Sequence, residues 1–120
     1  KIGINTPSVT NFENDIELVI SLNNLSIATS GNYRNFYIID DKLYHHEINP
    51  KTGYPISSNL GSVSIISDQS CLDADALSTM FYTVDNFEIV ENLNGVESLS
   101  ILLNEDKSFT RVFSSGFPKN

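Results

Sequence analysis

Apolar and polar residues alternate early in the chain in a way that predicts a β-strand. Within residues 15–23 the apolar side chains recur at every second position, at Ile16, Leu18, Ile20 and Leu22. One face of such a strand is apolar and the other polar, so this segment is predicted to be a half-buried strand. Further apolar runs, "LSIATS" before Gly31 and "SVSIIS" at residues 62–67, predict two more strands.

Two pairs of short segments, each joined by an acidic turn, predict β-hairpins. "RNFYIID" and "LYHHEI" are rich in aromatic and branched residues and flank Asp40-Asp41-Lys42. "SLSILLN" and "SFTRVFS" flank Glu105-Asp106-Lys107 near the end of the chain. Alternating segments around a tight turn are typical of antiparallel hairpins. "NPKTGYP", at residues 49–55, contains two prolines and a glycine and predicts an irregular turn.

Helical periodicity begins at Ser70. Ser70 followed by Asp73 has the form of a capping box at a helix N-terminus. This helix is predicted to bury an apolar stripe made of Ala76, Leu77, Met80, Phe81 and Val84. A shorter helix, "NFEIVENLN", is predicted to follow and to stop at Gly95. Together the elements predict an α+β domain in which an antiparallel or mixed sheet of hairpins packs with two consecutive helices.

The composition suits one acidic globular domain, with 120 residues and a net charge of −8. Nucleic acid and anionic membranes are poor partners for such a surface, and a phosphorylated ligand would need a cation between itself and the protein. The one cysteine, Cys71, excludes an intramolecular disulfide and a Cys-x-x-Cys metal cluster within this chain. No apolar run is long enough to span a membrane, and no signal peptide is visible.

Asp75 and Thr79 form the first candidate site. They lie four residues apart on the predicted helix, so their side chains share one face at the edge of the apolar stripe, near Tyr82 and Thr83. A carboxylate and a hydroxyl are hard oxygen ligands, which suit Mg²⁺ and do not suit zinc. Spacing alone favours the alternative, an ordinary solvated helix face. Asp73 is expected to cap the helix and not to bind metal.

His45 and His46 form the second candidate site, and they are the only histidines in the chain. Adjacent residues of a strand point to opposite faces, so one ring is predicted to face a cleft and the other to face solvent. A histidine at a strand end beside a turn can act as a general base. The alternative is a partly buried aromatic strand residue, which spacing alone favours.

A third candidate is "ATSGNY" at residues 28–33, where small residues follow an apolar strand. Such a segment can leave backbone N–H groups open to an anion or a flat ring. Arg34, Lys42 and Lys51 could each contact a phosphate, although solvated surface charge is the ordinary role of such residues.

Taken in order, these segments resemble the C-terminal part of the ApbE family, the FAD:protein FMN transferases. "SIATSGNY", "YHHEINPKTGYP" and "DADALST" resemble the family's A-T-S-G-x-Y, H-x-I-D-P-x-T-G-Y-P and A-D-A-x-x-T motifs. "KIGINTP" and "SSGF" resemble further family segments, so the resemblance extends over essentially the whole chain. It implies that residues 1–120 form one domain, the C-terminal portion of a longer flavin transferase. The N-terminal FAD-binding portion would then be absent, and these residues alone are not expected to be active.

The resemblance also implies roles for individual residues. His46 falls on the family's catalytic histidine, and Asp75 and Thr79 fall on its magnesium ligands. The residues implied to lie at the flavin nucleotide are Thr29, Ser30, Gly31, Tyr33, Thr52, Gly53 and Tyr54. Two positions depart from the family pattern: Asn49 replaces the usual Asp, and Glu47 takes a position that is usually apolar.

The implied reaction is Mg²⁺-dependent transfer of FMN from FAD to a Thr or Ser hydroxyl of an acceptor protein, with release of AMP. The expected partners are therefore FAD and an acceptor protein. The alternatives are a Mg²⁺-dependent FAD pyrophosphatase, in which water attacks, and a non-catalytic flavin-binding module. The family is typically extracytoplasmic and membrane-anchored through an N-terminal lipidated cysteine, and the resemblance implies the same here. Cys71 is internal and cannot be that anchor.

Overall fold

The computed structural model describes residues 1–8, 15–33, 35–84, 86 and 88–119. Its strands are β1 (Ile2–Asn5), β2 (Ile16–Ile20), β3 (Ser26–Gly31), β4 (Phe36–Ile39), β5 (Lys42–His45), β6 (Leu60–Ser67), β7 (Val96–Leu103) and β8 (Phe109–Phe113). Between β6 and β7 lie the α-helix α1 (Cys71–Val84) and the 3₁₀ helix η1 (Glu88–Asn92). The paired strands are all antiparallel. The predicted α+β class and both predicted hairpins are therefore confirmed.

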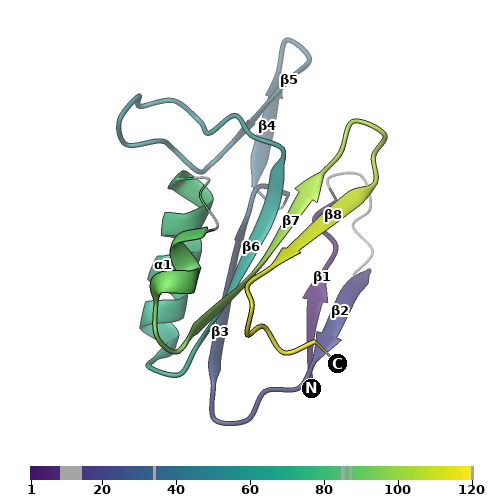
Figure 1. The fold of residues 1–120 in the computed structure, drawn as a ribbon. Helices are drawn as coiled ribbons and strands as arrows, with labels where there is room; N and C mark the ends of the chain where they lie inside the picture. Colours follow the sequence, from purple (N-terminus) through teal and green to yellow (C-terminus); the bar gives the residue numbers. More distant parts are fainter. Residues whose placement is uncertain (9–14, 34, 85, 87, 120) are drawn as a thin grey trace.

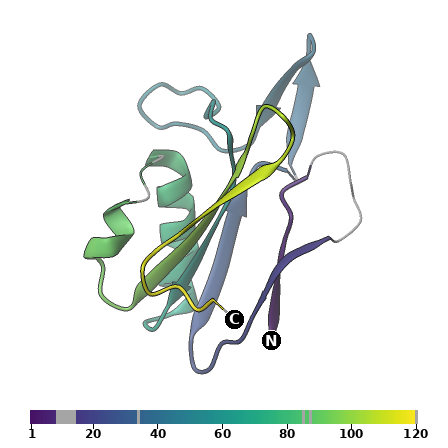
Figure 2. The same cartoon turned by 45° about the vertical axis from the view of Figure 1, so that its right-hand side comes forward.

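The molecule has three layers, built around a four-stranded sheet with the order β3-β6-β7-β8 (Figure 1). Helix α1 covers one face of this sheet, and the β1–β2 ribbon covers the other (Figure 2). Val63 and Ile65 of β6 belong to the apolar cluster under α1, whereas Ile66 belongs to the cluster under the ribbon. Because β6 is covered on both faces, all eight of its residues are buried. Strand β3 forms one edge of the sheet, which leaves its outer side open to other segments.

Helix α1 begins as the sequence predicts. The Ser70 hydroxyl oxygen accepts the backbone N–H of Asp73 at 3.1 Å and donates to the Asp73 carboxylate at 2.5 Å. These bonds satisfy one of the free amides at the helix N-terminus and hold an acidic residue in the first turn. Asp73 is thus occupied as a cap.

The buried face of α1 differs from the predicted stripe. The buried residues are Ala74, Ser78, Phe81 and Tyr82, while Ala76, Met80 and Val84 are exposed. The polar groups on this face are satisfied internally, since Tyr82 donates its hydroxyl to the Leu60 carbonyl at 2.9 Å. The predicted stripe was wrong at Ala76, Met80 and Val84. Residues with polar groups lie on the buried face instead, because their hydroxyls have hydrogen-bond partners there.

The β4–β5 hairpin extends beyond the end of the main sheet (Figure 1). Its turn has Asp40 and Asp41 at φ values of 49° and 59°, as a two-residue hairpin turn of type I′ requires. Aspartate tolerates this left-handed conformation better than most residues other than glycine. Lys42, which was predicted to belong to the turn, is the first residue of β5. The end of this hairpin places the next residue, His46, beside the edge strand β3.

The second predicted helix is a single 3₁₀ element, η1, and not an α-helix. Val90 is its one buried residue, and Ile89 is half-buried against the same cluster under α1. A segment of five residues is far shorter than a helix that is stable by itself. Gly95 follows with a φ of 71°, a conformation that favours glycine, as its predicted role as a stop requires.

Within the described ranges, the structure contains no helix that is long and apolar enough to cross a membrane.

Candidate functional site

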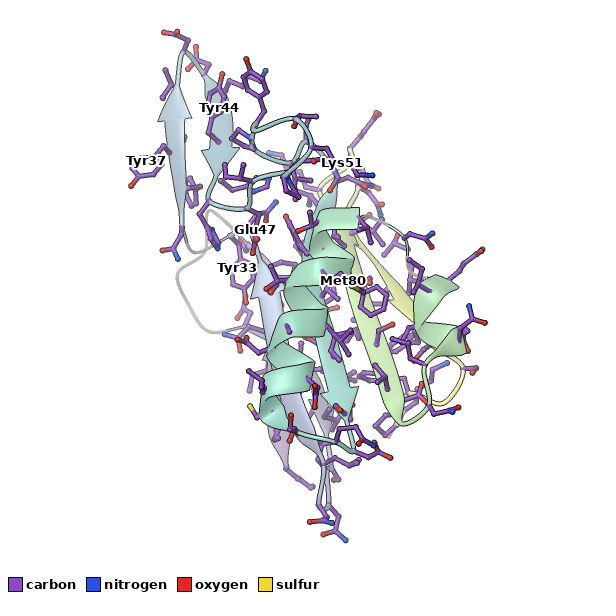
Figure 3. The ribbon with its side chains drawn as sticks, turned by 90° about the vertical axis from the view of Figure 1, so that its left-hand side faces the viewer. Tyr33, Tyr37, Tyr44, Glu47, Lys51 and Met80 are labelled. Carbon is purple, nitrogen blue, oxygen red and sulfur yellow. The ribbon has the colours of Figure 1, made fainter. Side chains whose placement is uncertain are left out.

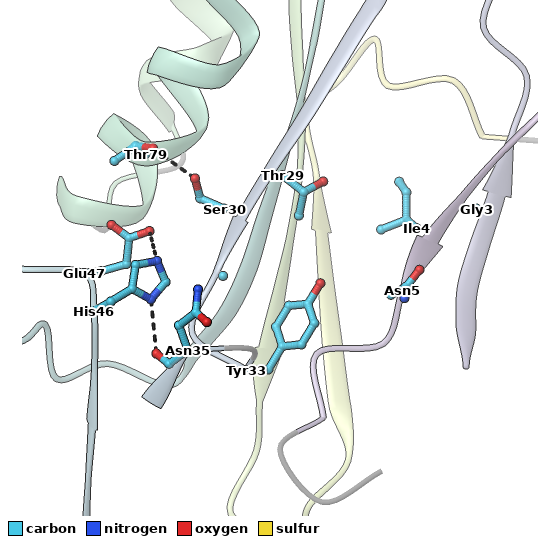
Figure 4. A pocket seen from close by; sticks show the side chains of 11 residues that line it. Gly3, Ile4, Asn5, Thr29, Ser30, Tyr33, Asn35, His46, Glu47 and Thr79 are labelled. Carbon is cyan, nitrogen blue, oxygen red and sulfur yellow. Dashed lines mark hydrogen bonds and ion pairs between the residues drawn. The ribbon is translucent and has the colours of Figure 1, made fainter. Parts of the chain in front are cut away.

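A pocket of about 450 Å³ lies at the open edge of β3, between α1 and the β1–β2 ribbon (Figure 4). It is lined by backbone and side chains from four separate parts of the chain: Gly3, Ile4, Asn5, Thr29, Ser30, Gly31, Tyr33, Asn35, His46, Glu47 and Thr79. Six of the predicted site residues are among these, namely Thr29, Ser30, Gly31, Tyr33, His46 and Thr79. The fold therefore brings together three segments that the sequence analysis identified separately.

Strand β3 supplies two hydroxyl groups to the pocket, one from each of its faces. The Thr29 hydroxyl lies 2.8 Å from the Ser64 hydroxyl on the neighbouring strand β6. The Ser30 hydroxyl points the other way, toward α1, where it lies 2.9 Å from Ser78 and 3.0 Å from Thr79. Because β3 is an edge strand, the pocket wraps around it and both hydroxyls reach the lining.

Gly31 allows the aromatic ring of Tyr33 to lie against the strand. A Cβ atom at Gly31 would lie 2.7 Å from a Tyr33 ring carbon and 2.9 Å from the Gly61 carbonyl oxygen. Real Cβ atoms do not approach other atoms that closely, so a side chain at this position would displace Tyr33 or the strand pairing. The glycine thereby shapes the floor of the pocket. Tyr33 and Glu47 both line the pocket, whereas Lys51 lies in the 49–55 turn and does not line it (Figure 3).

The hydroxyls on α1 form a directed chain of hydrogen bonds. Ser78 donates to the Asp75 carbonyl at 2.9 Å, so the contact between Ser30 and Ser78 requires Ser30 as donor. Ser30 then has no second hydrogen for Thr79, and the single hydroxyl hydrogen of Thr79 is directed to Ser30 at 3.0 Å or to the Asp75 carbonyl at 3.4 Å. This order leaves the lone pairs of the Thr79 hydroxyl oxygen available. A cation at the pocket could use them without breaking the chain.

Asp75 lies one helical turn before Thr79, with its side chain exposed. The hydroxyls of Ser78 and Thr79 donate to the backbone carbonyl of Asp75, and no hydrogen bond from the described part of the chain occupies its carboxylate. Its side chain does not line the pocket as the structure stands. The described residues contain no cluster of three or more His, Cys, Asp or Glu side chains. Asp75 and Thr79 offer one carboxylate and one hydroxyl, which suit an ion that keeps water and phosphate ligands, as Mg²⁺ does.

His46 faces the pocket, as predicted, and both of its ring nitrogens have a neighbour (Figure 4). Nδ1 lies 3.1 Å from the Asn35 carbonyl oxygen, and Nε2 lies 3.5 Å from a carboxylate oxygen of Glu47. A carbonyl oxygen only accepts, so the bond to Asn35 requires a proton on Nδ1. The lone pair of the neutral ring is then on Nε2, which is the atom that can take a proton.

The other histidine, His45, does not face solvent as predicted. Its ring is 6% exposed and packs edge-on against Tyr82, with ring centroids 6.0 Å apart. The strand alternation was correct, but the second face of β5 is covered by the core and not by water. His45 is a core residue.

The predicted residues Thr52, Gly53 and Tyr54 lie outside the pocket lining. They form an exposed turn in which the amides of Thr52 and Gly53 donate to the Asn49 carbonyl at 3.3 and 2.8 Å. Gly53 has a φ of 72°, which explains a glycine at this position. Tyr54 lines a separate pocket that also contains His45. The turn is connected to the main pocket indirectly, because the Ile56 amide that follows it donates to the carbonyl of the lining residue Glu47 at 3.0 Å.

Several lining residues were not predicted from the sequence. β1 contributes Gly3, Ile4 and Asn5 through a ribbon that reaches the pocket only in the folded chain. No local pattern in those residues indicates a site. Of the three cations considered for phosphate contact, Arg34 lies outside the described residues, and Lys42 and Lys51 do not line the pocket.

Comparison with known proteins agrees with this arrangement. The profile described as "ApbE family" matches residues 1–102. FAD:protein FMN transferases from Haemophilus influenzae and Vibrio cholerae are 36% and 35% identical over 99% and 98% of this chain. The solved structure of flavin transferase ApbE from Vibrio cholerae superposes with a TM-score of 0.76 at 30% identity, covering 97% of this chain and 36% of that one. The Thermotoga maritima ApbE structure gives a TM-score of 0.71 at 32% identity, covering 92% of this chain and 35% of that one.

The fold is α+β, like that of the ApbE structures on which the chain superposes. The chain belongs to the ApbE family. It spans about a third of the length of the curated relatives it matches, 34% in both cases.

Proposed function

We propose that this chain forms part of an enzyme that transfers FMN from FAD to a Thr or Ser hydroxyl of an acceptor protein and releases AMP. The observation that supports the proposal is the meeting of His46, Ser30 and Thr79 in one pocket. These residues come from a post-hairpin segment, an edge strand and a helix, and a base beside an oxygen-rich helix face is what phosphoryl chemistry requires. The curated relatives carry the name of this activity.

His46 takes the role of general base. The acceptor hydroxyl oxygen attacks the flavin-side phosphorus of FAD and forms a phosphoester bond, while the bond from that phosphorus to the bridging oxygen breaks. The hydroxyl proton passes to Nε2 of His46, and AMP leaves with the bridging oxygen. Nδ1 keeps its proton and its bond to the Asn35 carbonyl, which holds the ring in position throughout. General bases of this kind contribute roughly 10²–10⁴-fold in rate.

Asp75 and Thr79 would hold Mg²⁺. Their donor chemistry fits this ion, since both offer oxygen and the hydroxyl chain leaves the Thr79 lone pairs available. When bound, the ion supplies positive charge that offsets the charge of the diphosphate. A positive charge is required at this site, because the net charge of −8 on the chain otherwise repels a phosphorylated ligand. Ser30 fixes the Thr79 hydroxyl relative to the strand.

β3 and Tyr33 would bind the nucleotide. The Thr29 hydroxyl and the open edge of β3 offer hydrogen-bonding groups, and the Tyr33 ring over Gly31 offers a flat apolar surface. A pocket with a few directed polar groups and an aromatic wall is typical of a cofactor site.

Product analysis tests the proposal. The whole protein that carries this sequence is incubated with FAD, Mg²⁺ and a candidate acceptor peptide, and products are separated by mass spectrometry. A covalent FMN–peptide adduct with one AMP per adduct supports the transferase. AMP with free FMN and no adduct supports the FAD pyrophosphatase instead. FAD binding with neither product supports a flavin-binding module.

A further inference from the structure

Glu47 carries the negative charge nearest to His46 in the described pocket. Its Oε1 lies 3.5 Å from Nε2 of His46, and its side chain is 12% exposed. The carboxylate thus lies at the ring nitrogen that is free to take a proton. Tyr33 is the other titratable residue among the described residues that line the pocket.

A carboxylate with this little exposure needs a partner. Burying a charge without one costs several kcal/mol in general, so unpaired buried carboxylates are rare. His46 is the one polar partner of the Glu47 side chain on the described part of the chain. The backbone of Glu47 is fixed as well, since its carbonyl accepts the Ile56 amide at 3.0 Å. The position of this carboxylate is therefore set by the fold.

Asn49 cannot serve in its place. Its side-chain oxygen accepts the Lys51 amide at 2.9 Å, and its backbone carbonyl accepts two further amides of the same turn. The side chain of residue 49 is directed to its own turn. An aspartate at this position would accept the same bond from the Lys51 amide. Having Asn here in place of Asp therefore removes little stabilising charge from the surroundings of His46. The charge at His46 comes from Glu47.

We propose that Glu47 is the positioning carboxylate of His46: it lies at Nε2 and accepts a hydrogen bond from that atom once His46 has taken the acceptor proton, which stabilises the imidazolium. This role rests on the proposed function. In the resting state Nδ1–H is bound to the Asn35 carbonyl and Nε2 carries the lone pair. After proton transfer both nitrogens carry protons, and each faces an oxygen acceptor, Asn35 on one side and Glu47 on the other. Both ring N–H groups have an acceptor in this charged state.

The first test is independent of catalysis. The 120-residue chain has two histidines, so ¹⁵N NMR resolves both rings and His45→Gln assigns them. The hydrogen bond at Nε2 is followed through the chemical shift of the His46 ring proton on that atom, compared between the native chain and Glu47→Gln at one pH low enough for histidine to be charged, below about 6.5. We expect the native signal to lie downfield, as a proton in a charge-assisted hydrogen bond does, and to lose that shift in Glu47→Gln. Glu105→Gln removes the same charge in the β7–β8 turn, away from the pocket lining, and should leave the signal unchanged.

The second test measures FMN transfer by the whole protein. Glu47→Gln is expected to lower kcat about tenfold while the KM for FAD and the Mg²⁺ concentration for half-activation stay the same. Glu47→Asp should recover part of the rate, because it restores the charge at a longer distance. A merely structural role would instead change folding and KM together.

The outcomes separate the two proposals. Native-level transfer by Glu47→Gln, or an unchanged Nε2–H signal of His46, would overturn the role of Glu47 and leave the transferase intact. A raised Mg²⁺ requirement in Glu47→Gln would also overturn it, because the carboxylate would then be a metal ligand. Absence of any transfer by the native protein, together with loss of the downfield shift in Glu47→Gln, would refute the proposed function while the pairing stands.

Discussion

The hydroxyl oxygens of Ser30 and Thr79 lie 3.0 Å apart, although 49 positions separate the two residues in sequence. One belongs to the edge strand β3 and the other to α1, so the bond joins the nucleotide side of the pocket to the proposed metal side. Ser78 adds a second bond from the same helix to Ser30. The helix can therefore not slide along the strand without breaking both bonds, and Thr79 is held at a defined place in the pocket.

Replacing Thr79 by valine should remove the proposed metal site without changing the shape of the helix. Valine is nearly isosteric with threonine but offers no oxygen ligand, so we expect the Mg²⁺-dependent part of FAD affinity to fall at least about tenfold. Calorimetric titration with FAD, with and without Mg²⁺, measures this. Thr83→Val is the matched control, since Thr83 bonds the carbonyl of Thr79 and does not line the pocket. Equal losses of Mg²⁺-dependent FAD affinity in both variants would show that the substitutions disturb the helix and do not remove a metal ligand.

Replacing Gly31 by alanine should destabilise the protein and disturb Tyr33. The new methyl group would lie 2.7 Å from the Tyr33 ring and 2.9 Å from a backbone oxygen. Overpacking of this kind typically costs about 1–3 kcal/mol, which urea unfolding would detect. Gly3→Ala serves as the comparison, because its methyl group meets only the flexible side chain of Ile16 at 3.3 Å. If the two variants unfold alike, the proposed close fit of Gly31 under Tyr33 is wrong.

The pKa of Glu91 should rise when Ser115 loses its hydroxyl. The Ser115 side chain and then its amide donate to the Glu91 carboxylate, at 2.6 and 2.8 Å, and both bonds hold the pKa of Glu91 below its ordinary value. A lowered folded pKa gives stability that is present above the ordinary glutamate value, about 4.3, and is lost as pH falls through the folded value. Ser115→Ala should therefore raise this pKa in a ¹³C NMR titration and weaken the acid-side pH dependence of stability. An unchanged titration would contradict the assignment.

Much of the fold follows from local patterns in the sequence. The strand in residues 15–23, the Asp40-Asp41 turn and the Ser70 cap each depend on neighbours along the chain, and the structure confirms the turn and the cap. The strand is confirmed over Ile16–Ile20, but its alternation holds only in part, because Ile16 is exposed whereas Ile20 is buried. His46 could be assigned to the pocket because strand alternation separates it from His45, and the neighbouring "INPKTGYP" segment identified which of the two to choose.

The remaining features depend on contacts between distant segments. Alternation showed that His45 and His46 diverge, but it could not show that the second face was covered by Tyr82. Ser78 and Tyr82 are buried on α1 because their hydroxyls find partners at Asp75 and Leu60, which no hydrophobic pattern contains. The contribution of β1 to the pocket likewise arises only when the ribbon packs on the sheet.

The most direct test of the account is FMN transfer by the whole protein with His46→Ala. FAD, Mg²⁺ and the acceptor are held in excess, and the covalent FMN adduct is followed by mass spectrometry beside calorimetric FAD binding. Transfer is expected to fall roughly 10²–10⁴-fold, while FAD affinity changes little. Transfer at an undiminished rate by His46→Ala would contradict the assignment of this pocket as the catalytic site.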